Sequence, residues 1–139
     1  MIRIDSCFSL SVLLACTALL TAAGCGGSDG PPRYDLEGTV KCDGQPVPAG
    51  EVFLQPDGSR GNASPGSLAL IKDGRYKTDP DKGIVGGAYT VRILGYDGVA
   101  VGDSSVGTSL FPQYEEQIEF PKEATTRDFD IPSASKSRR

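Results

Sequence analysis

The side chains that could do chemistry in this chain are carboxylates, tyrosines and cysteines, because the sequence contains no histidine. This absence excludes the Ser-His-Asp and Cys-His catalytic arrangements and the H-E-x-x-H zinc site, which are common routes to hydrolysis. An enzyme that relied on carboxylates alone would need two of them facing each other across a cleft. A small β-rich domain offers little cleft. We therefore expect a non-enzymatic protein with no catalytic residue, no cofactor and no metal site.

Loop carboxylates are the remaining candidates for metal binding. The segment Asp79-Pro-Asp81-Lys-Gly83 places two carboxylates close to a glycine, but it lacks the other ligands and the distal glutamate of an EF-hand loop. Aspartates in loops usually serve turn geometry, so we interpret this segment as a solvated turn. A calcium site assembled from separate loops is the alternative.

Two tyrosines are candidate ligand contacts. Tyr96 lies between Gly95 and Asp97, and Tyr114 follows a short Phe-Pro-Gln segment. An exposed aromatic ring at either position could stack on a sugar or a peptide. The alternative is packing, since isolated surface aromatics are common. Tyr76 and Tyr89 fall on inward positions of predicted strands, and we expect both in the core.

The N-terminal segment has the features of a signal peptide, which we predict over residues 1–24. An apolar run of 16 residues, 8–23, is shorter than the about 20 residues that a membrane-spanning helix needs. The following Leu20-Thr-Ala-Ala-Gly-Cys25 resembles the lipobox of bacterial lipoproteins. This resemblance implies cleavage before Cys25 and lipidation of its thiol, with palmitate among the attached chains. The alternative is an ordinary secretory signal cut at the Ala-Ala-Gly stretch.

The resemblance to lipoproteins also implies a location. Residues 25–33 would be a lipidated tether that holds the domain within roughly 25 Å of the lipid. We expect a lipid-anchored protein of the cell membrane or outer membrane that faces the periplasm or the cell exterior, and Gly26 after the cysteine favours the outer membrane. The membrane is then the first partner. A net charge of −4 without a long block of like charge excludes nucleic acid.

The cysteines agree with this interpretation. Cys7 and Cys16 would leave with the signal peptide and Cys25 would carry lipid, so that only Cys42 remains in the folded domain. Strand alternation places Cys42 on the same face as Val40. We expect a buried, inert thiol, and a reactive or intermolecular thiol is the alternative.

The rest of the chain has the pattern of short strands. Its 139 residues allow one domain, and 18 Gly and 10 Pro punctuate β-branched and aromatic runs. Asp73-Gly74 predicts a tight hairpin turn, and residues 57–66 and 95–109 predict polar loops. We expect strands over about 34–42, 51–55, 68–72, 75–78 and 89–93, a closing pair of strands around 118–120 and 129–131, and a disordered basic tail over 133–139.

A family resemblance follows from the turn and strand residues. The motifs Gly38-x-Val40-x-x-Asp43-Gly44-x-Pro46-Val47-x-x-Gly50-x-Val52, Asp73-Gly74-x-Tyr76 and Gly87-x-Tyr89-x-Val91 are similar to carboxypeptidase regulatory-like (transthyretin-like, prealbumin-like) domains of small bacterial lipoproteins. The resemblance implies an all-β fold over residues 34–132, an antiparallel two-sheet sandwich of about seven strands, immunoglobulin-like or transthyretin-like.

The matching residues are turn formers and core hydrophobes, which folding alone explains. The function we expect is accordingly broad: a non-catalytic, membrane-anchored envelope lipoprotein whose sandwich is a structural or interaction module for an envelope protein or glycan. The alternative is a carbohydrate- or peptide-binding surface domain, with or without calcium, that uses the loops 57–66 and 95–109.

Overall fold

A computed structural model describes residues 30–133 of the chain. The predicted signal peptide, Cys25 with most of the predicted tether, and the predicted basic tail from residue 134 onward lie outside this range. The described residues from Pro31 onward belong to one compact unit, the β domain. None of the helical structure within residues 30–133 has the length and hydrophobicity that crossing a membrane requires.

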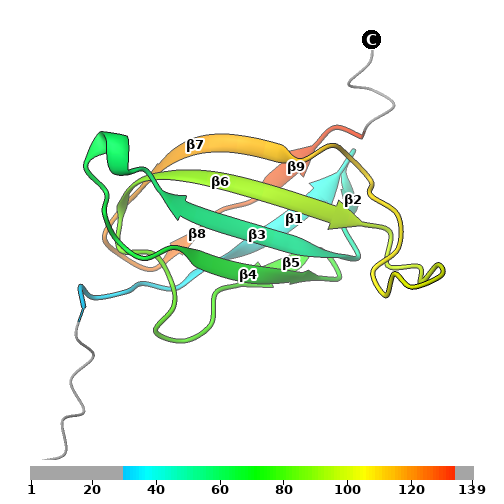
Figure 1. Ribbon diagram of the computed structural model, residues 1–139, viewed down its shortest axis with the longest axis horizontal. Helices are drawn as coiled ribbons and strands as arrows, with labels where there is room; N and C mark the ends of the chain where they lie inside the picture. Colours follow the sequence, from blue (N-terminus) through cyan, green and yellow to red (C-terminus); the bar gives the residue numbers. More distant parts are fainter. Residues whose placement is uncertain (1–29, 134–139) are drawn as a thin grey trace, which may run out of the picture. The chain divides into compact units, whose positions relative to one another are not determined.

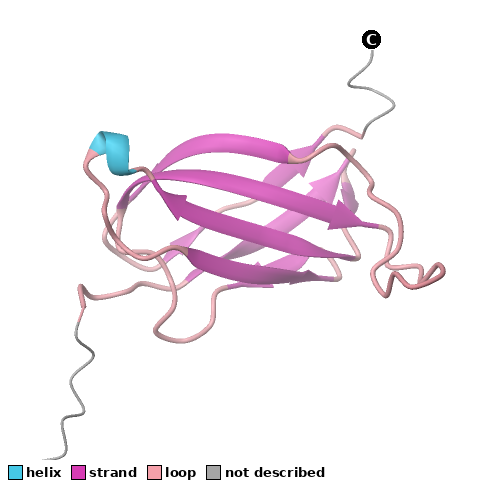
Figure 2. Cartoon of the chain, viewed as in Figure 1, coloured by secondary structure: helices cyan, strands magenta, loops and turns pink. Residues whose placement is uncertain are grey.

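The β domain consists of nine strands and one short 3-10 helix, and no α-helix occurs between residues 30 and 133 (Figure 2). This confirms the predicted all-β class. The elements, in chain order, are β1 (Leu36–Cys42), β2 (Gln45–Pro46), β3 (Ala49–Pro56), η1 (Gly58–Arg60), β4 (Ser67–Lys72), β5 (Arg75–Lys77), β6 (Gly87–Tyr96), β7 (Tyr114–Phe120), β8 (Thr125–Thr126) and β9 (Phe129–Ile131).

The strands form a curled sheet with the order β2-β1-β5-β4-β3-β6-β7. Every pairing along this path is antiparallel, whereas β8 and β9 run parallel to β1 on its other side. The curl brings β1, β8 and β9 behind β3 and β6 (Figure 1). The two ends of the sheet then meet through side chains: Tyr114 of β7 packs edge-on against Phe129 of β9, with ring centroids 6.3 Å apart.

Two Asp-Gly pairs make the tightest turns. Asp73 and Gly74 have φ angles of 50° and 76°, as a type I′ turn requires, and they join β4 to β5 as predicted. Asp43 and Gly44, with φ angles of 51° and 81°, join β1 to β2 in the same way. The short strand β2 was not predicted, and it contains Pro46. Proline is compatible with a short edge strand, since the missing N–H costs no ladder bond there.

The core lies inside the curl. The alternation predicted for the first strand is confirmed, because Leu36, Val40 and Cys42 are all buried. Tyr76 and Tyr89 are buried as expected, with 3% and 0% of their surface exposed. The other large buried side chains come from five strands and from three connections between strands: Val47, Val52, Leu54, Ile71, Ile84, Val91, Ile93, Phe111, Phe120, Phe129 and Ile131.

One predicted pairing is wrong. The segments around 118–120 and 129–131 are strands, but they do not pair with each other: β7 pairs with β6, and β9 pairs with β1 in parallel. Alternating hydrophobicity identifies which face of a strand is buried, and it carries no information about the neighbouring strand. The segment from residue 97 to 113 is a long loop, in agreement with the predicted loop over 95–109, except that Gly95 and Tyr96 extend β6.

Candidate functional site

A groove with a volume of about 1250 Å³ lies on the outward face of β4, β5 and β1. Its floor comes from these strands, and its sides come from the loop around residues 79–82 and from the segment 126–128. The lining combines apolar, basic and acidic side chains, among them Arg33, Leu68, Leu70, Lys72, Arg75, Lys77, Asp81 and Lys82. We call this surface the β4–β5 face.

Hairpin register explains why two leucines are exposed on the β4–β5 face. The Asp73-Gly74 turn pairs Ile71 with Tyr76, and both of these side chains point into the core. Side chains along a strand alternate between faces. Leu68 and Leu70 therefore point outward, with 44% and 53% of their surface exposed.

Most charged groups in the groove are already engaged. Lys77 forms ion pairs with Glu37 at 3.1 Å and Asp35 at 3.4 Å, and Lys82 forms one with Asp79 at 3.4 Å. The hydrogen bonds that the Lys77 ammonium donates, first to Glu37 and then to Asp35, raise its pKa. By contrast, exposed Lys72 and Arg75, which face each other across the β4–β5 hairpin, form no ion pair within residues 30–133.

Asp128 closes the groove beside β1. Its Oδ1 accepts hydrogen bonds from the Thr39 amide at 2.7 Å and the Thr39 hydroxyl at 2.8 Å. These bonds hold the pKa of the Asp128 carboxyl below its ordinary value of 3.8. Next to it, burial raises the pKa of the Tyr76 hydroxyl, which donates to the Arg127 carbonyl at 2.7 Å. The hydrogen bonds of Asp128 and Tyr76 therefore hold the segment that leads into β9 against β1 and β5.

The lowered pKa of Asp128 predicts a contribution to acid stability. The contribution is fully present at a pH above the unfolded-state pKa of 3.8, and it is lost as the pH falls through the lower folded-state pKa. Asp128→Asn should therefore flatten the decline of the free energy of unfolding below about pH 4. Urea denaturation across this pH range measures it. Asp103→Asn, in the exposed loop after β6, is the control; equal profiles for the two variants would contradict the prediction.

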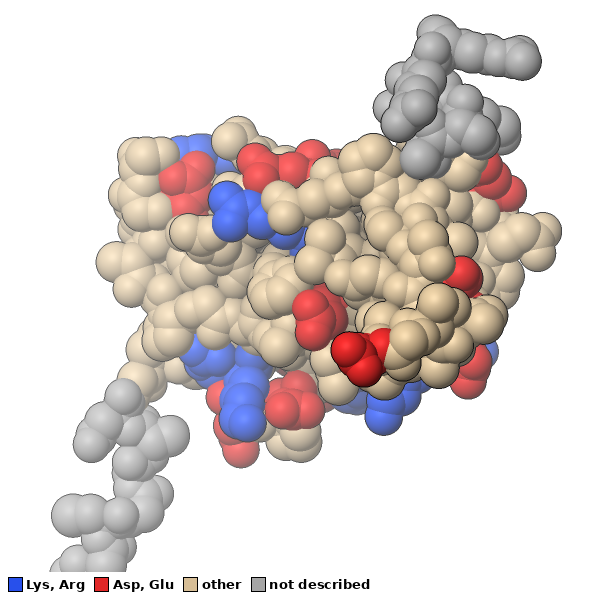
Figure 3. Space-filling view, turned by 45° about the vertical axis from the view of Figure 1, so that its right-hand side comes forward, with Lys and Arg blue, Asp and Glu red and all other residues tan. Residues whose placement is uncertain are grey.

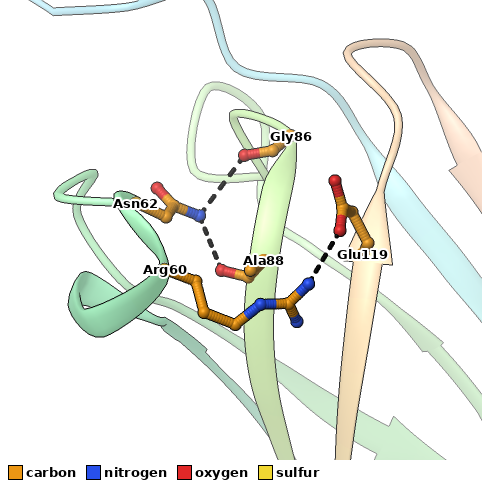
Figure 4. A network of polar contacts seen from close by, with 5 residues as sticks. All are labelled: Arg60, Asn62, Gly86, Ala88 and Glu119. Carbon is orange, nitrogen blue, oxygen red and sulfur yellow. Dashed lines mark hydrogen bonds and ion pairs between the residues drawn. The ribbon is translucent and has the colours of Figure 1, made fainter.

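A second, smaller hollow lies where β6 begins. There Asn62 connects the loop after η1 to β6: its side-chain amide donates to the carbonyls of Ala88 at 2.8 Å and Gly86 at 3.3 Å (Figure 4). Its Oδ1 accepts from the Ser64 hydroxyl at 2.6 Å. Arg60 beside it contacts Glu119 at 2.9 Å, as an ion pair on the surface. The half-buried Asn62 amide thus clamps the loop in place.

Loss of this clamp should destabilise the domain. Asn62→Ala removes the side-chain donor to the Gly86 carbonyl and one of the two donors to the Ala88 carbonyl, which still accepts from the Asp57 amide at 2.9 Å. We expect a cost of about 1–3 kcal/mol in the free energy of unfolding. Arg60→Ala removes only an exposed ion pair and should cost below about 0.5 kcal/mol. Thermal or urea unfolding of the two variants compares them. Equal losses would show that Asn62 does not clamp the loop.

The predicted ligand tyrosines do not form one site. Tyr114 lies directly opposite Ile93 and therefore on the core face, where it packs on Phe129 and donates to Glu116 at 2.9 Å. Burial and the bond to Glu116 raise its pKa. Tyr96 lies three residues beyond Ile93, on the outward face of β6. The two rings point to opposite faces of the sheet.

The two predicted binding loops, 57–66 and 95–109, lie at opposite ends of β6. The loop 57–66 is held to the first residues of β6 through Asn62, whereas the loop from residue 97 leaves the last residue, Tyr96. The ten residues of β6 separate them by about 30 Å. The two loops therefore cannot enclose one small ligand.

The described carboxylates do not assemble into a metal site. Within residues 30–133, no group of three or more His, Cys, Asp or Glu side chains lies close enough to hold an ion. Asp79 contacts Lys82 instead, and Asp81 occupies a turn with φ of 60°. The chemistry that the groove offers is apolar contact and attraction of negative charge. Leu68, Leu70, Lys72 and Arg75 were not recognised from the sequence as site residues.

The fold and the groove define a class of protein: an all-β domain with a curled antiparallel sheet and an exposed, mixed apolar and basic surface. Comparison of the sequence with protein-family models and with curated proteins gave no match.

Proposed function

We propose that this protein is a non-catalytic lipoprotein of the cell envelope, anchored to the membrane through lipid on Cys25, whose β domain is a contact module. The observation that carries the contact role is the β4–β5 face. Two leucines are exposed there, together with two cations, Lys72 and Arg75, that form no ion pair with any other residue between 30 and 133. A surface of this composition suits binding to another apolar and negatively charged surface.

The proposed anchor depends on the N-terminal sequence. The apolar run followed by Leu20-Thr-Ala-Ala-Gly-Cys25 supports cleavage before Cys25 and lipidation of its thiol. The small domain would then work at the surface of the cell membrane or the outer membrane, on the side of the periplasm or the cell exterior.

We further propose that the β domain is a carboxypeptidase regulatory-like, transthyretin-like sandwich. In this proposal the curl separates a layer of β4, β3, β6 and β7 from a layer of β5, β1, β8 and β9. Support comes from the two Asp-Gly turns and from Gly38 and Gly50, since a Cβ at either glycine would lie about 2 Å from a carbonyl oxygen: 1.8 Å from that of Arg127 and 2.1 Å from that of Leu94. An experimental structure with β5 in the same flat layer as β4 and β3 would contradict it.

Lipidation is testable on the native protein. Cells grown with a palmitate analogue should label the wild type and the Cys42→Ala control, whose thiol is buried, and should not label Cys25→Ala. Mass spectrometry of the wild-type N-terminal peptide should find a lipid-modified Cys25 as its first residue. An unmodified cysteine, or a different N-terminus, would refute the proposed anchor.

A further inference from the structure

The β4–β5 face lies beside the entry of the chain into the β domain. Arg33, which lines the groove, donates to the carbonyls of Gly83 and Pro65, both at 3.3 Å. Cys25 precedes Arg33 by eight residues, and a fully extended chain spans at most about 3.6 Å per residue. A lipid on Cys25 would therefore be held within about 30 Å of this end of the groove.

The groove on this face has a slight excess of basic groups, unlike the rest of residues 30–133 taken together. The groove lining carries five Lys or Arg and four Asp or Glu side chains, whereas the rest of residues 30–133 carries five and twelve. Three of the four groove carboxylates are engaged by Lys77, Lys82 or Thr39, and Asp81 is the fourth. In Figure 3, Lys and Arg lie with acidic groups along the lower margin and again at the upper left, while much of the front surface is uncharged.

Apolar side chains extend the face beyond the groove. Phe53 on β3 lies directly opposite Leu68 on β4 and has 37% of its surface exposed. With Leu70 they form a contiguous apolar strip on neighbouring strands. Lys72 and Arg75 lie at the end of this strip, across the hairpin turn.

We infer that the β4–β5 face rests on the anionic lipid surface of the membrane that holds the anchor. The inference depends on the proposed lipidation, because the tether supplies the proximity. Leucine and phenylalanine side chains can enter the boundary between headgroups and acyl chains, and lysine and arginine beside them attract lipid phosphates. A short tether raises the effective concentration of the face at the bilayer, so that weak contacts suffice.

Depth-dependent fluorescence quenching tests this orientation. The lipidated protein carries a fluorophore on Leu70→Cys, or on Gln117→Cys as the control; Gln117 is exposed on β7, and β7 and β4 lie at opposite edges of the run β4-β3-β6-β7 in Figure 1. The protein is reconstituted into phosphatidylcholine vesicles with phosphatidylglycerol, and lipids carrying spin labels are the quenchers. We expect strong quenching at position 70 and little at position 117, with less at position 70 in high salt or in vesicles of phosphatidylcholine alone.

Charge reversal gives the second measurement. Lys72→Glu with Arg75→Glu should weaken the contact by on the order of fivefold per cation, and quenching at position 70 should fall accordingly. The matched control, Arg60→Glu with Lys122→Glu, reverses two cations that line the smaller hollow and should leave the quenching unchanged. Both pairs lie on exposed residues, so that unfolding curves check that the fold is kept.

The outcomes separate this inference from the proposed function. A lipidated protein that stays in the vesicles with equal or no quenching at positions 70 and 117 overturns the orientation and leaves the anchor intact. Shielding of position 70 in native envelopes but not in lipid vesicles indicates a protein partner on this face, and it also overturns the inference. A protein without lipid on Cys25 contradicts both proposals.

Discussion

Gly38→Ala is expected to destabilise the β domain by at least about 3 kcal/mol in the free energy of unfolding. A Cβ on Gly38 would lie 1.8 Å from the Arg127 carbonyl oxygen and 2.7 Å from its carbon. These are backbone atoms, which no rotamer change can move away. Relief of the clash requires displacement of the chain between β8 and β9, which also accepts the Tyr76 hydrogen bond.

Urea denaturation measures the loss, and Gly58→Ala is its control. A Cβ on Gly58 meets no atom within 4 Å, so this variant should stay within about 0.5 kcal/mol of the wild type. Hydrogen exchange gives an independent readout, because the amides that pair β9 with β1 should lose protection in Gly38→Ala first. Wild-type stability of this variant would mean that the Arg127 carbonyl does not lie against Gly38.

Phe111→Ala should cost about 3–5 kcal/mol. The Phe111 side chain is 2% exposed, although it belongs to the long loop before β7. It packs on Gly95, where a Cβ would come within 2.5 Å of the ring. Truncation leaves a cavity at this end of the core that the backbone of β6 cannot fill.

The same substitution at an exposed position is the control for Phe111. Phe53→Ala removes a side chain that is 37% exposed on the outward face of β3, and we expect a loss below about 1.5 kcal/mol. Thermal unfolding of both variants gives the comparison. Equal losses at the two positions would contradict the assignment of Phe111 to the core.

Local features were predictable because they depend on few residues. The Asp73-Gly74 hairpin follows from the backbone freedom of that pair, and the burial of Leu36, Val40 and Tyr89 follows from alternation along single strands. The parallel pairing of β9 with β1 joins segments about 90 residues apart. Such pairing is decided by the packing of the whole core, which a local pattern does not encode.

The exposed leucines of the β4–β5 face could have been predicted from the sequence, but they were not. Along Leu68-Ala-Leu-Ile71 the two leucines are exposed while the smaller Ala69 is buried, so that hydrophobicity alone suggests the wrong face. The hairpin shows which side chains of β4 point inward, because a two-residue turn pairs Ile71 with Tyr76. Tyr76 points into the core, so Ile71 does too, and the neighbouring Leu70 points outward. Lys72 and Arg75 beside Leu70 form no ion pair within residues 30–133. This could be recognised only from the positions of the surrounding carboxylates in the fold.

The contact between β7 and β9, where the two ends of the curled sheet meet, affects how copies of the protein behave at high density. A long free strand edge can recruit a strand from another copy and so nucleate fibres. Here the edge of β7 faces the segment before β9, where Arg127 reaches Glu116 at 3.0 Å and Phe129 meets Tyr114. Charged side chains along β7, which are unfavourable for pairing with a strand of another copy, protect the edge further. Many copies held at high density on one surface can therefore remain separate, without polymerising through their sheets.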